Sequence, residues 1–415
     1  MRPALSIFIL MLFNGMSHAQ NLPDNFLGDL LKQKGSPLLQ DILSHPETYR
    51  YQLIYTKIDR DKKNVPHFHD YTLRLDKDEY FNPASTVKMP LAFLALEKLN
   101  EQRVEGVDKY TPMLTDSAYG GQSAVTADTT SRDGLPSIAH YIRKIFLVSD
   151  NDSYNRLYEF LGQQYINERL WKKGYKDTRI TRRFVSMDED QNRHTNPLRF
   201  KKSDGSFYFQ PPAISTVKFD FSKQVLMGNA HYDRNEKLVD SPMDFTKHNN
   251  VPLQDLQQIL RSVLFPASVP AARRFNLQKD DYDFLYRYMS ELPSESRYPR
   301  YDTSEYFDSY TKFFLFKSGK GKIPPNIRVF NKPGWSYGFL TDVAYIVDFE
   351  HNVEFMLSGV IYVNSDGVLN DDKYEYDQIG YPFFKEVGEI VYRYELERTR
   401  AVRPDLSRFR LSYKD

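Results

Sequence analysis

The sequence predicts an α/β fold in which an antiparallel sheet, built from both ends of the chain, is flanked by helices and joined to a mostly helical subdomain. Two observations predict it. Apolar residues alternate with polar ones, as in strands, over 49–75 and again over 326–363. Between these segments the clearest periodic stretches have helical spacing. Strands from both termini therefore form one sheet, and the middle of the chain supplies most of the helices.

The N-terminal part predicts two helices followed by a hairpin. NLPDNFLGDLLKQKGSPLLQDILSH (21–45) has helical spacing that is broken at Gly35-Ser36-Pro37, so we expect a short helix pair. The alternation over 49–75 is interrupted by DRDKKN (59–64), which is typical of a turn between two strands. A helix is then expected over LAFLALEKL (91–99).

The middle of the chain predicts a helical region and then an irregular one. A Gly/Ser/Thr/Asp-rich loop (114–135) leads to the helical segments 137–148 and 149–162, the second ending at Gly162. From about 176 to 245 the pattern is irregular, with strand-like pieces such as FYFQ and STVKFDF. We therefore expect one catalytic domain over 20–415 with an extra irregular region near 200–245.

The C-terminal part returns to regular patterns. Helices are expected over 251–265 and 280–293, and an amphipathic helix over 381–399 closes the chain. The segment 326–363 predicts three successive strands, with turns at Lys332–Gly338 and Phe349–Asn352.

The first residues predict a secretory signal peptide. Arg2 gives a positive start, 5–13 is apolar, and Ser17-His18-Ala19 supplies the small residues that precede cleavage, which we expect after Ala19. The apolar run is too short to span a bilayer, and no later stretch is long enough either. We therefore expect a soluble secreted or periplasmic protein without stable membrane insertion.

Composition excludes several classes of partner and site. The chain has no cysteine, which excludes disulfides, Cys-based zinc sites and lipid attachment at a lipobox. Its 56 basic and 55 acidic residues leave a net charge of +1, so no nucleic-acid partner is indicated. The 30 tyrosines and 29 phenylalanines are assigned to the core and to strand faces.

One pair of histidines could belong to a metal site. His67 and His69 lie two residues apart on a predicted strand, so both imidazoles share one face. The sequence places no third ligand beside them, and we expect an exposed strand rim, with no metal and no cofactor.

The tetrapeptide Ser-Thr-Val-Lys occurs twice, and a serine three residues before a lysine can be a nucleophile with its base one helical turn away. For Ser85 and Lys88, Asn82-Pro83 predicts a helix start that would place both side chains on one face, with Pro90 distorting the first turn. The other copy, 215–218, continues into alternating apolar residues, which predict a strand whose serine and lysine face opposite ways. Only the first copy is a catalytic candidate.

Two later motifs complete a pattern. Ser149-Asp150-Asn151 and Lys332-Pro333-Gly334 follow Ser85 in the order S-x-x-K, S-D-N, K-T-G, which resembles the class A β-lactamases and penicillin-binding proteins. KPGWSYGFLTDVAYI, KYTPM (109–113) and RHTNP (193–197) are also similar to segments of class A enzymes. The resemblance covers roughly residues 45–400 and is interrupted near 200–245. It implies the β-lactamase/transpeptidase-like fold.

The resemblance implies a role for each motif residue. Ser85 would be the acylated nucleophile, Lys88 would accept its proton, and Ser149 would pass a proton to the leaving amine. Asn151 would hold the substrate amide carbonyl, and Lys332 would orient Ser149 and help to bind the substrate carboxylate.

Four further residues complete the expected site. The backbone N–H groups of Ser85 and Trp335 would form the oxyanion hole, and Gly334 lies beside them in the substrate-binding segment. Asp150 would cap or brace its loop. Tyr110 would either wall the cleft or only pack.

Two departures from the family pattern bear on function. Pro333 replaces the motif threonine and has no hydroxyl for a substrate carboxylate; Ser336 is the candidate substitute, and FLTDVAYI contains no arginine. Phe184 falls near the place of the acid that activates the deacylating water, and the nearest acids are Asp188, Glu189 and Asp190, for which a solvated acidic turn is the favoured interpretation. Glu189 is the candidate deacylation acid.

The sequence thus predicts an exported serine hydrolase that forms an acyl-enzyme at Ser85, with a class A-type β-lactamase as the first interpretation. The alternatives are a penicillin-binding D-Ala-D-Ala-directed peptidase and a non-hydrolytic binding module. The expected partner is a small β-lactam or a cell-wall peptide, and we expect a monomer.

Overall fold

A five-stranded antiparallel sheet lies at the centre of the computed structural model, which describes residues 22–413. Its strand order is β10-β11-β12-β1-β2, formed by β1 (Gln52–Arg60), β2 (Pro66–Leu73), β10 (Ile327–Ser336), β11 (Phe339–Asp348) and β12 (Val353–Tyr362). Because β1 pairs with β12, the two ends of the chain share one sheet. This arrangement confirms the predicted sheet.

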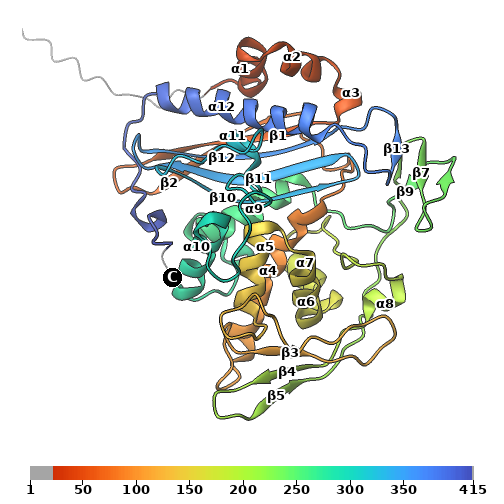
Figure 1. Cartoon of the computed structure of the whole chain (residues 1–415). Coiled ribbons are helices and arrows are strands. Elements are labelled where there is room, and N and C mark those ends of the chain that lie inside the picture. Colours follow the sequence, from red (N-terminus) through yellow and green to blue (C-terminus); the bar gives the residue numbers. More distant parts are fainter. Residues whose placement is uncertain (1–21, 414–415) are drawn as a thin grey trace, which may run out of the picture.

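Helices cover both faces of the sheet (Figure 1). On one face lie the N-terminal helices and the closing helix: α1 (Phe26–Lys34), α2 (Pro37–Ser44), α3 (Pro46–Tyr49), α11 (Phe313–Phe316) and α12 (Tyr381–Glu397). On the other face lies the helical subdomain: α4 (Lys88–Gln102), α5 (Ile138–Val148), α6 (Asn151–Leu161), α7 (Gln163–Lys172), α8 (Glu189–Arg193), α9 (Leu253–Leu264) and α10 (Lys279–Ser290).

Two hydrophobic cores lie on opposite faces of the sheet because strand side chains alternate. Leu53 and Tyr55 of β1 point into the core under α12, whereas Ile54 and Ile58 point into the core of the helical subdomain. All ten residues of β11 and of β12 are buried. The continuous burial explains why their apolar pattern is nearly unbroken.

The hairpin of β10 and β11 is tighter than predicted. The sequence placed a turn over Lys332–Gly338, but β10 continues to Ser336 and only Tyr337 and Gly338 turn. Pro333 is compatible with a strand here because β10 is at the edge of the sheet, where a missing N–H breaks no ladder on its outer side.

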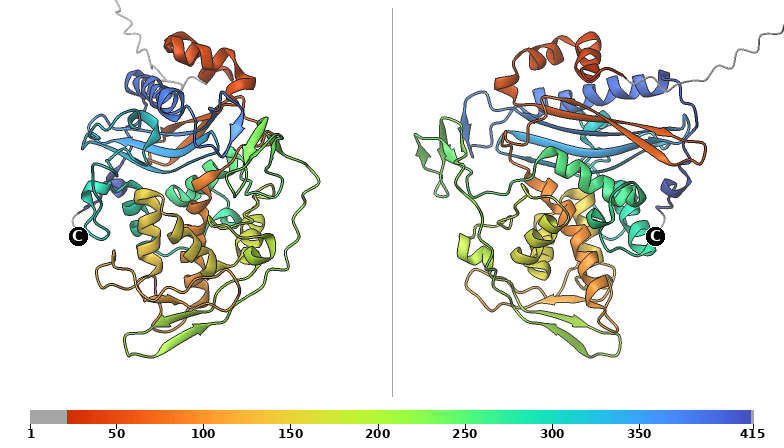
Figure 2. Two further views of the ribbon diagram at one scale, coloured as in Figure 1. Left: turned by 45° about the vertical axis from the view of Figure 1, so that its right-hand side comes forward. Right: turned by 180° about the vertical axis from the view of Figure 1, so that it is seen from behind.

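The region from 198 to 248 adds short strands along one side of the molecule (Figure 2, green). β4 (Leu198–Lys201) and β5 (Phe207–Gln210) extend β3 (Met113–Thr115), and the region also contains β6 (Leu226–Met227), β7 (Ala230–Tyr232), β8 (Leu238–Val239) and β9 (Met243–Asp244). β13 (Val368–Leu369), from the C-terminal part of the chain, pairs with β7.

The strand expected over 215–221 is wrong. Only Ile214 makes an isolated bridge, and residues 215–221 run without a strand partner. Their alternating aromatic residues pack locally instead: Phe219 contacts Trp171 and Phe221, with ring centroids 6.1 and 5.8 Å apart. The alternating apolar residues of 215–221 therefore serve side-chain packing, and their backbone pairs with no strand.

The predicted signal peptide lies outside the described residues. Among residues 22–413, no helix is both long enough and apolar enough to cross a membrane.

Candidate active site

A distorted turn presents Ser85 at the start of α4. Residues Ala84–Val87 form a 3₁₀ turn, and α4 begins at Lys88. The Asn82 side chain accepts a hydrogen bond from the Ala84 N–H (2.8 Å), and the Thr86 hydroxyl donates to the Pro83 carbonyl (2.6 Å). Pro90 falls in the first turn of α4, where its missing N–H costs little. The predicted helix start is therefore a tight turn that leaves Ser85 partly exposed.

Lys88 is fully buried beside the S-D-N motif. Its ammonium donates to Asn151 Oδ1 (2.6 Å), to Ser149 Oγ (3.3 Å) and to the Ser149 carbonyl. Burial disfavours the charged form and lowers the pKa of Lys88 to about 7, against a smaller opposing effect of the Asp150 carboxylate. A lysine of this pKa can accept a proton near neutral pH.

Ser149, Asp150 and Asn151 form the junction between α5 and α6. Ser149 ends α5 in the left-handed conformation (φ 62°), so the chain reverses there. Asp150 caps α6 by accepting a hydrogen bond from the Ser153 N–H (2.7 Å), as expected for a bracing residue. The sharp junction points the side chains on both sides of Asp150 towards Lys88.

The third motif reaches the same point from the sheet. Lys332 of β10 is fully buried and donates to Ser149 Oγ (2.8 Å) and to the Pro333 carbonyl (2.7 Å). Burial, and then the nearby Lys88 ammonium, hold the pKa of Lys332 well below its usual range. Ser149 Oγ therefore lies between two lysine amines.

Gly334 allows β10 to approach the Ser85 turn. A Cβ at this position would lie 2.7 Å from the Ser85 nitrogen and 2.9 Å from the Pro83 oxygen, closer than side chains can pack. Only glycine fits this approach, which brings the backbone of Trp335 near the serine. The oxyanion hole expected from the N–H groups of Ser85 and Trp335 stays a prediction.

A pocket of about 370 Å³ opens over these residues. Ser85, the whole Ser149-Asp150-Asn151 motif and the two residues that follow Gly334 line it, and four of its lining side chains are aromatic. The full lining is Ala84, Ser85, Val148, Ser149, Asp150, Asn151, Phe184, Tyr306, Tyr310, Trp335 and Ser336. Ser336, the expected substitute for the motif threonine, is thus in the pocket.

Phe184 lies beside Lys88. Its ring centroid is 4.9 Å from the Lys88 ammonium, and its N–H donates to Asn155 Oδ1 (2.8 Å). A phenyl ring therefore lies against the Lys88 amine. A cation over an aromatic face is favourable, but the ring cannot accept a proton.

The placement expected for Glu189 is wrong. It lies in α8, pairs with Lys247 (2.5 Å) at the surface, and lines a different pocket, of about 630 Å³. Its neighbour Asp188 caps α8, and Asp190 accepts a hydrogen bond from the Tyr119 hydroxyl. The acidic turn is solvated, so it supplies no carboxylate to Ser85.

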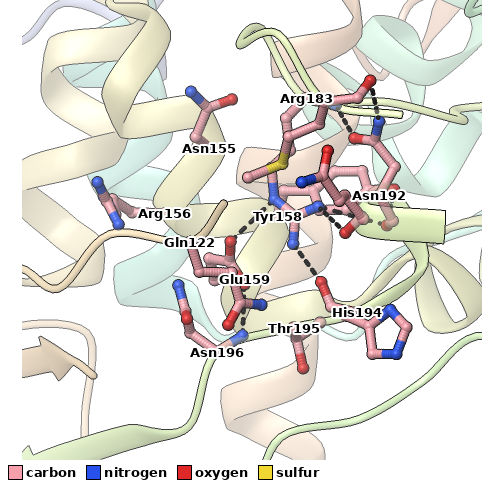
Figure 3. Close-up of polar contacts among 12 residues, drawn as sticks. Gln122, Asn155, Arg156, Tyr158, Glu159, Arg183, Asn192, His194, Thr195 and Asn196 are labelled. Atoms are coloured by element: carbon pink, nitrogen blue, oxygen red, sulfur yellow. Dashed lines mark hydrogen bonds and ion pairs between the residues drawn. The ribbon is translucent and has the colours of Figure 1, made fainter. Parts of the chain in front are cut away.

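A buried ion pair fixes the segment that carries Phe184 (Figure 3). Arg183 donates to Glu159 Oε1 (2.8 Å) and to the His194 carbonyl (2.6 Å), and the Asn196 N–H donates to Glu159 Oε2 (2.6 Å). Both ends of the segment are thereby tied to α6. The sequence did not predict this anchor, although a glutamate within the apolar pattern of 149–162 is a signal for a buried pair.

Of the two alternatives left open for Tyr110, the structure shows packing, and Tyr110 does not line the Ser85 pocket. The side chain is exposed and its ring packs on Phe284 of α10 (6.1 Å). The carbonyl of its neighbour Lys109 accepts a hydrogen bond from Ala139 at the start of α5, whereas Ser149 lies at the other end of that helix. The tyrosines that do line the pocket are Tyr306 and Tyr310, which the tyrosine-rich stretch YDTSEYFDSY could have indicated.

A buried cluster of hydrogen-bonded side chains supports β10, and the sequence did not predict it. Lys312 donates to Asn331 Oδ1 (2.7 Å) and to the Met289 carbonyl (2.7 Å), and Asn331 donates to Asp342 Oδ1 (2.8 Å). Burial lowers the pKa of Lys312 to about 7 and raises the pKa of Asp342 to about 6. This group fixes the strand residue that precedes Lys332.

The two histidines of β2 lie near separate carboxylates. His67 is 3.6 Å from Asp61, and His69 is 4.0 Å from Asp59. No cluster of three or more His, Cys, Asp or Glu side chains suited to a metal ion occurs within 22–413.

The fold and the site together define a class. A sheet built from both termini, a helical subdomain on one face, and a serine with buried lysines at their junction are features of β-lactamase-like serine hydrolases. Residues 39–204 match the model of the beta-lactamase enzyme family, which confirms the predicted resemblance and the serine-hydrolase class.

Several solved structures are similar to this chain. The β-lactamase of Desulfarculus baarsii DSM 2075 shares 13% identity over 91% of this chain and 100% of its own, with a TM-score of 0.49. The β-lactamase of Streptosporangium roseum shares 13% identity (88% and 98% covered, TM-score 0.48), and the class A β-lactamase of Mycobacterium abscessus 15% (89% and 97%, 0.45). No curated protein matches the chain.

Proposed function

We propose that the protein is an exported serine hydrolase of class A type, which opens a β-lactam amide through an acyl-enzyme at Ser85. One observation carries the proposal: Ser149 Oγ lies 3.3 Å from Lys88 Nζ and 2.8 Å from Lys332 Nζ. A hydroxyl between two amines of lowered pKa can pass a proton from the base to a leaving nitrogen. A module that only binds has no use for this arrangement.

Acylation uses the chain's own groups at each step. Ser85 Oγ attacks the amide carbon while its proton passes to the neutral Lys88 amine, and the N–H groups of Ser85 and Trp335 bind the oxyanion. The C–N bond then breaks, Ser149 gives its proton to the nitrogen, and the Lys88 ammonium returns a proton to Ser149. Lys88 ends neutral, and the acyl group is on Ser85.

Substrate binding would use the polar lining of the pocket. Asn151 lines the pocket and would donate its amide N–H to the substrate carbonyl, since its Oδ1 already accepts a hydrogen bond from the buried Lys88. Ser336 offers a hydroxyl for a carboxylate in place of the missing threonine at position 333.

A second candidate function is a penicillin-binding peptidase directed at D-Ala-D-Ala. Phe184 favours it, because a phenyl ring beside Lys88 cannot activate water for hydrolysis of the acyl-enzyme. Acylation is unaffected by this replacement, so in both candidates the adduct forms and only its lifetime differs.

The test is the intact mass of the purified protein during incubation with benzylpenicillin. An adduct of one penicillin that disappears as product accumulates supports the β-lactamase, and a lasting adduct supports the peptidase. The Ser85→Ala variant should form no adduct and no hydrolysis product. An unmodified wild-type protein and unchanged penicillin would refute acylation at Ser85.

A further inference from the structure

Aromatic side chains from one segment form a wall of the pocket. Tyr306 and Tyr310 lie in the loop that precedes α11, and both line the pocket together with Trp335 of β10. Ring centroids are 5.0 Å apart for Tyr306 and Tyr310 and 5.8 Å for Tyr310 and Trp335. We call these three residues the aromatic wall.

The base of the wall is anchored on three sides. The Thr311 hydroxyl donates to the Phe146 and Leu147 carbonyls near the end of α5, both at 3.4 Å. Asn331 of β10 donates to the Thr311 carbonyl (2.7 Å), and Lys312 donates to the carbonyl of Met289 in α10. Thr311 and Lys312 are fully buried. The segment therefore holds its tyrosines in place before a ligand arrives.

Lys317 supports the wall from behind. Its buried ammonium lies 4.6 Å from the ring centroids of Phe307 and Tyr310, 4.9 Å from Tyr381 and 5.9 Å from Trp335, and it donates to the Tyr310 carbonyl (3.1 Å). Burial lowers the pKa of this lysine to about 8. Lys317 therefore packs against the rings behind the wall and stabilises their positions, and these rings cover its ammonium.

The wall lies beside the end of α5 that leads into Ser149. The Thr311 hydroxyl donates to the carbonyls of Phe146 and Leu147, which lie three and two residues before Ser149. The Ser149 hydroxyl would protonate the leaving nitrogen, and it lines the same pocket as Tyr306 and Tyr310. A group attached to the leaving nitrogen would meet Tyr306 and Tyr310.

The wall presents three aromatic rings to the pocket. Asp150 is the one charged residue in the described lining of the pocket, and no arginine or lysine is among its lining residues. Aromatic faces at this spacing favour a planar unsaturated group by stacking.

We propose that the aromatic wall selects acyl donors that carry a flat aromatic group on the leaving-group side of the scissile amide. The inference rests on the proposed acylation of Ser85 and names its preferred substrate class. Tyr306 and Tyr310 act as specificity residues, and Lys317 is a positioning residue.

Two cephalosporins test the inference because they share one acyl side chain. Nitrocefin and cephalothin both carry a thienylacetamido group, but nitrocefin has a dinitrostyryl group on the leaving-group side where cephalothin has acetoxymethyl. The measurement is the second-order rate constant of adduct formation with each compound, and the quantity compared is their ratio, which removes any general change in reactivity.

We expect Tyr310→Ala and Tyr306→Ala each to lower the nitrocefin-to-cephalothin ratio by about five- to tenfold, as loss of one aromatic pair predicts. Tyr310→Phe, which keeps the ring, should retain the wild-type ratio. Tyr298→Ala is the matched control, because this exposed tyrosine of the same connection is not in the pocket lining. Tyr306→Ala keeps the test valid if Tyr310→Ala does not fold.

An unchanged ratio in folded Tyr306→Ala and Tyr310→Ala proteins, with adducts still forming, would overturn the wall but leave acylation at Ser85 standing. Absence of any adduct in the wild type would overturn both.

Discussion

The two copies of Ser-Thr-Val-Lys have the same sequence but differ in backbone conformation, in the burial of the lysine and in the residues that they contact. At 85–88 the serine lies in a tight turn under β10 and the lysine is fully buried among the hydroxyl and amide groups of 149–151. At 215–218 the backbone of Ser215 pairs with Arg193, and Lys218 borders two surface pockets. Reactivity therefore depends on burial and on partners from distant parts of the chain.

The largest expected difference between the copies is in the lysines. Lys88→Met should lower the rate of adduct formation by roughly 10³-fold or more, because the proton acceptor is lost. Lys218→Met should leave the rate unchanged. Rates of penicillin adduct formation by mass spectrometry measure both, and equal rates for the two variants would remove Lys88 from the mechanism.

Placing an acid beside the first copy should change the fate of the acyl-enzyme. Phe184→Glu puts a carboxylate next to Lys88, in a segment fixed by Arg183 and Glu159. We expect the adduct to hydrolyse about 10²-fold faster, since a general base contributes at least this much. Phe184→Gln is the control of similar size, and an equal gain in both variants would mean that space, not the carboxylate, was limiting.

Strand β10 lies so close to Ser85 that a side chain at Gly334 would collide with the Ser85 backbone. Gly334→Ala places a methyl group 2.7 Å from the Ser85 nitrogen, which should push the oxyanion donors apart and lower acylation by about 10²-fold. Gly321→Ala is the matched change, because a Cβ at that position would have no atom within 4 Å. Acylation rates and thermal unfolding of both proteins separate lost geometry from lost stability.

The burial of Lys88 predicts a pH profile for acylation. Its pKa is lowered to about 7, and only the neutral amine can take the Ser85 proton. The rate should therefore fall about tenfold for each pH unit below this pKa and level off above it. In Phe184→Glu the new carboxylate favours the ammonium form, so the midpoint should move to higher pH. A wild-type rate that does not change with pH from the acidic to the neutral range would contradict a lysine base.

The smallest effect is expected at Glu189. Its ion pair with Lys247 lies at the surface and outside the Ser85 pocket, so Glu189→Gln should change acylation and adduct lifetime by less than about twofold. The same penicillin time course measures both quantities. A long-lived adduct that appears only in Glu189→Gln would show that this acid does reach the acyl-enzyme.

Local patterns predicted most of the architecture. The helices over 137–148 and 149–162 and the three strands over 326–363 follow from apolar spacing, and the order of the three motifs selected Ser85 over Ser215. The errors occurred where the pattern had two explanations. Alternating rings at 217–221 pack on one another without a neighbouring strand, and Tyr110, for which KYTPM left a cleft wall or packing open, packs on Phe284.

The sequence by itself determined the periodicity of the sheet and helices, the choice of Ser85 and Lys88 as candidate nucleophile and base, and the proline in place of a threonine at 333. Only the tertiary structure decided that Phe184 lies against Lys88, that Glu189 does not, and that Tyr306 and Tyr310 wall the pocket. The physical reason is that a lowered pKa or a shared pocket arises from burial among residues distant in sequence, which no local pattern records.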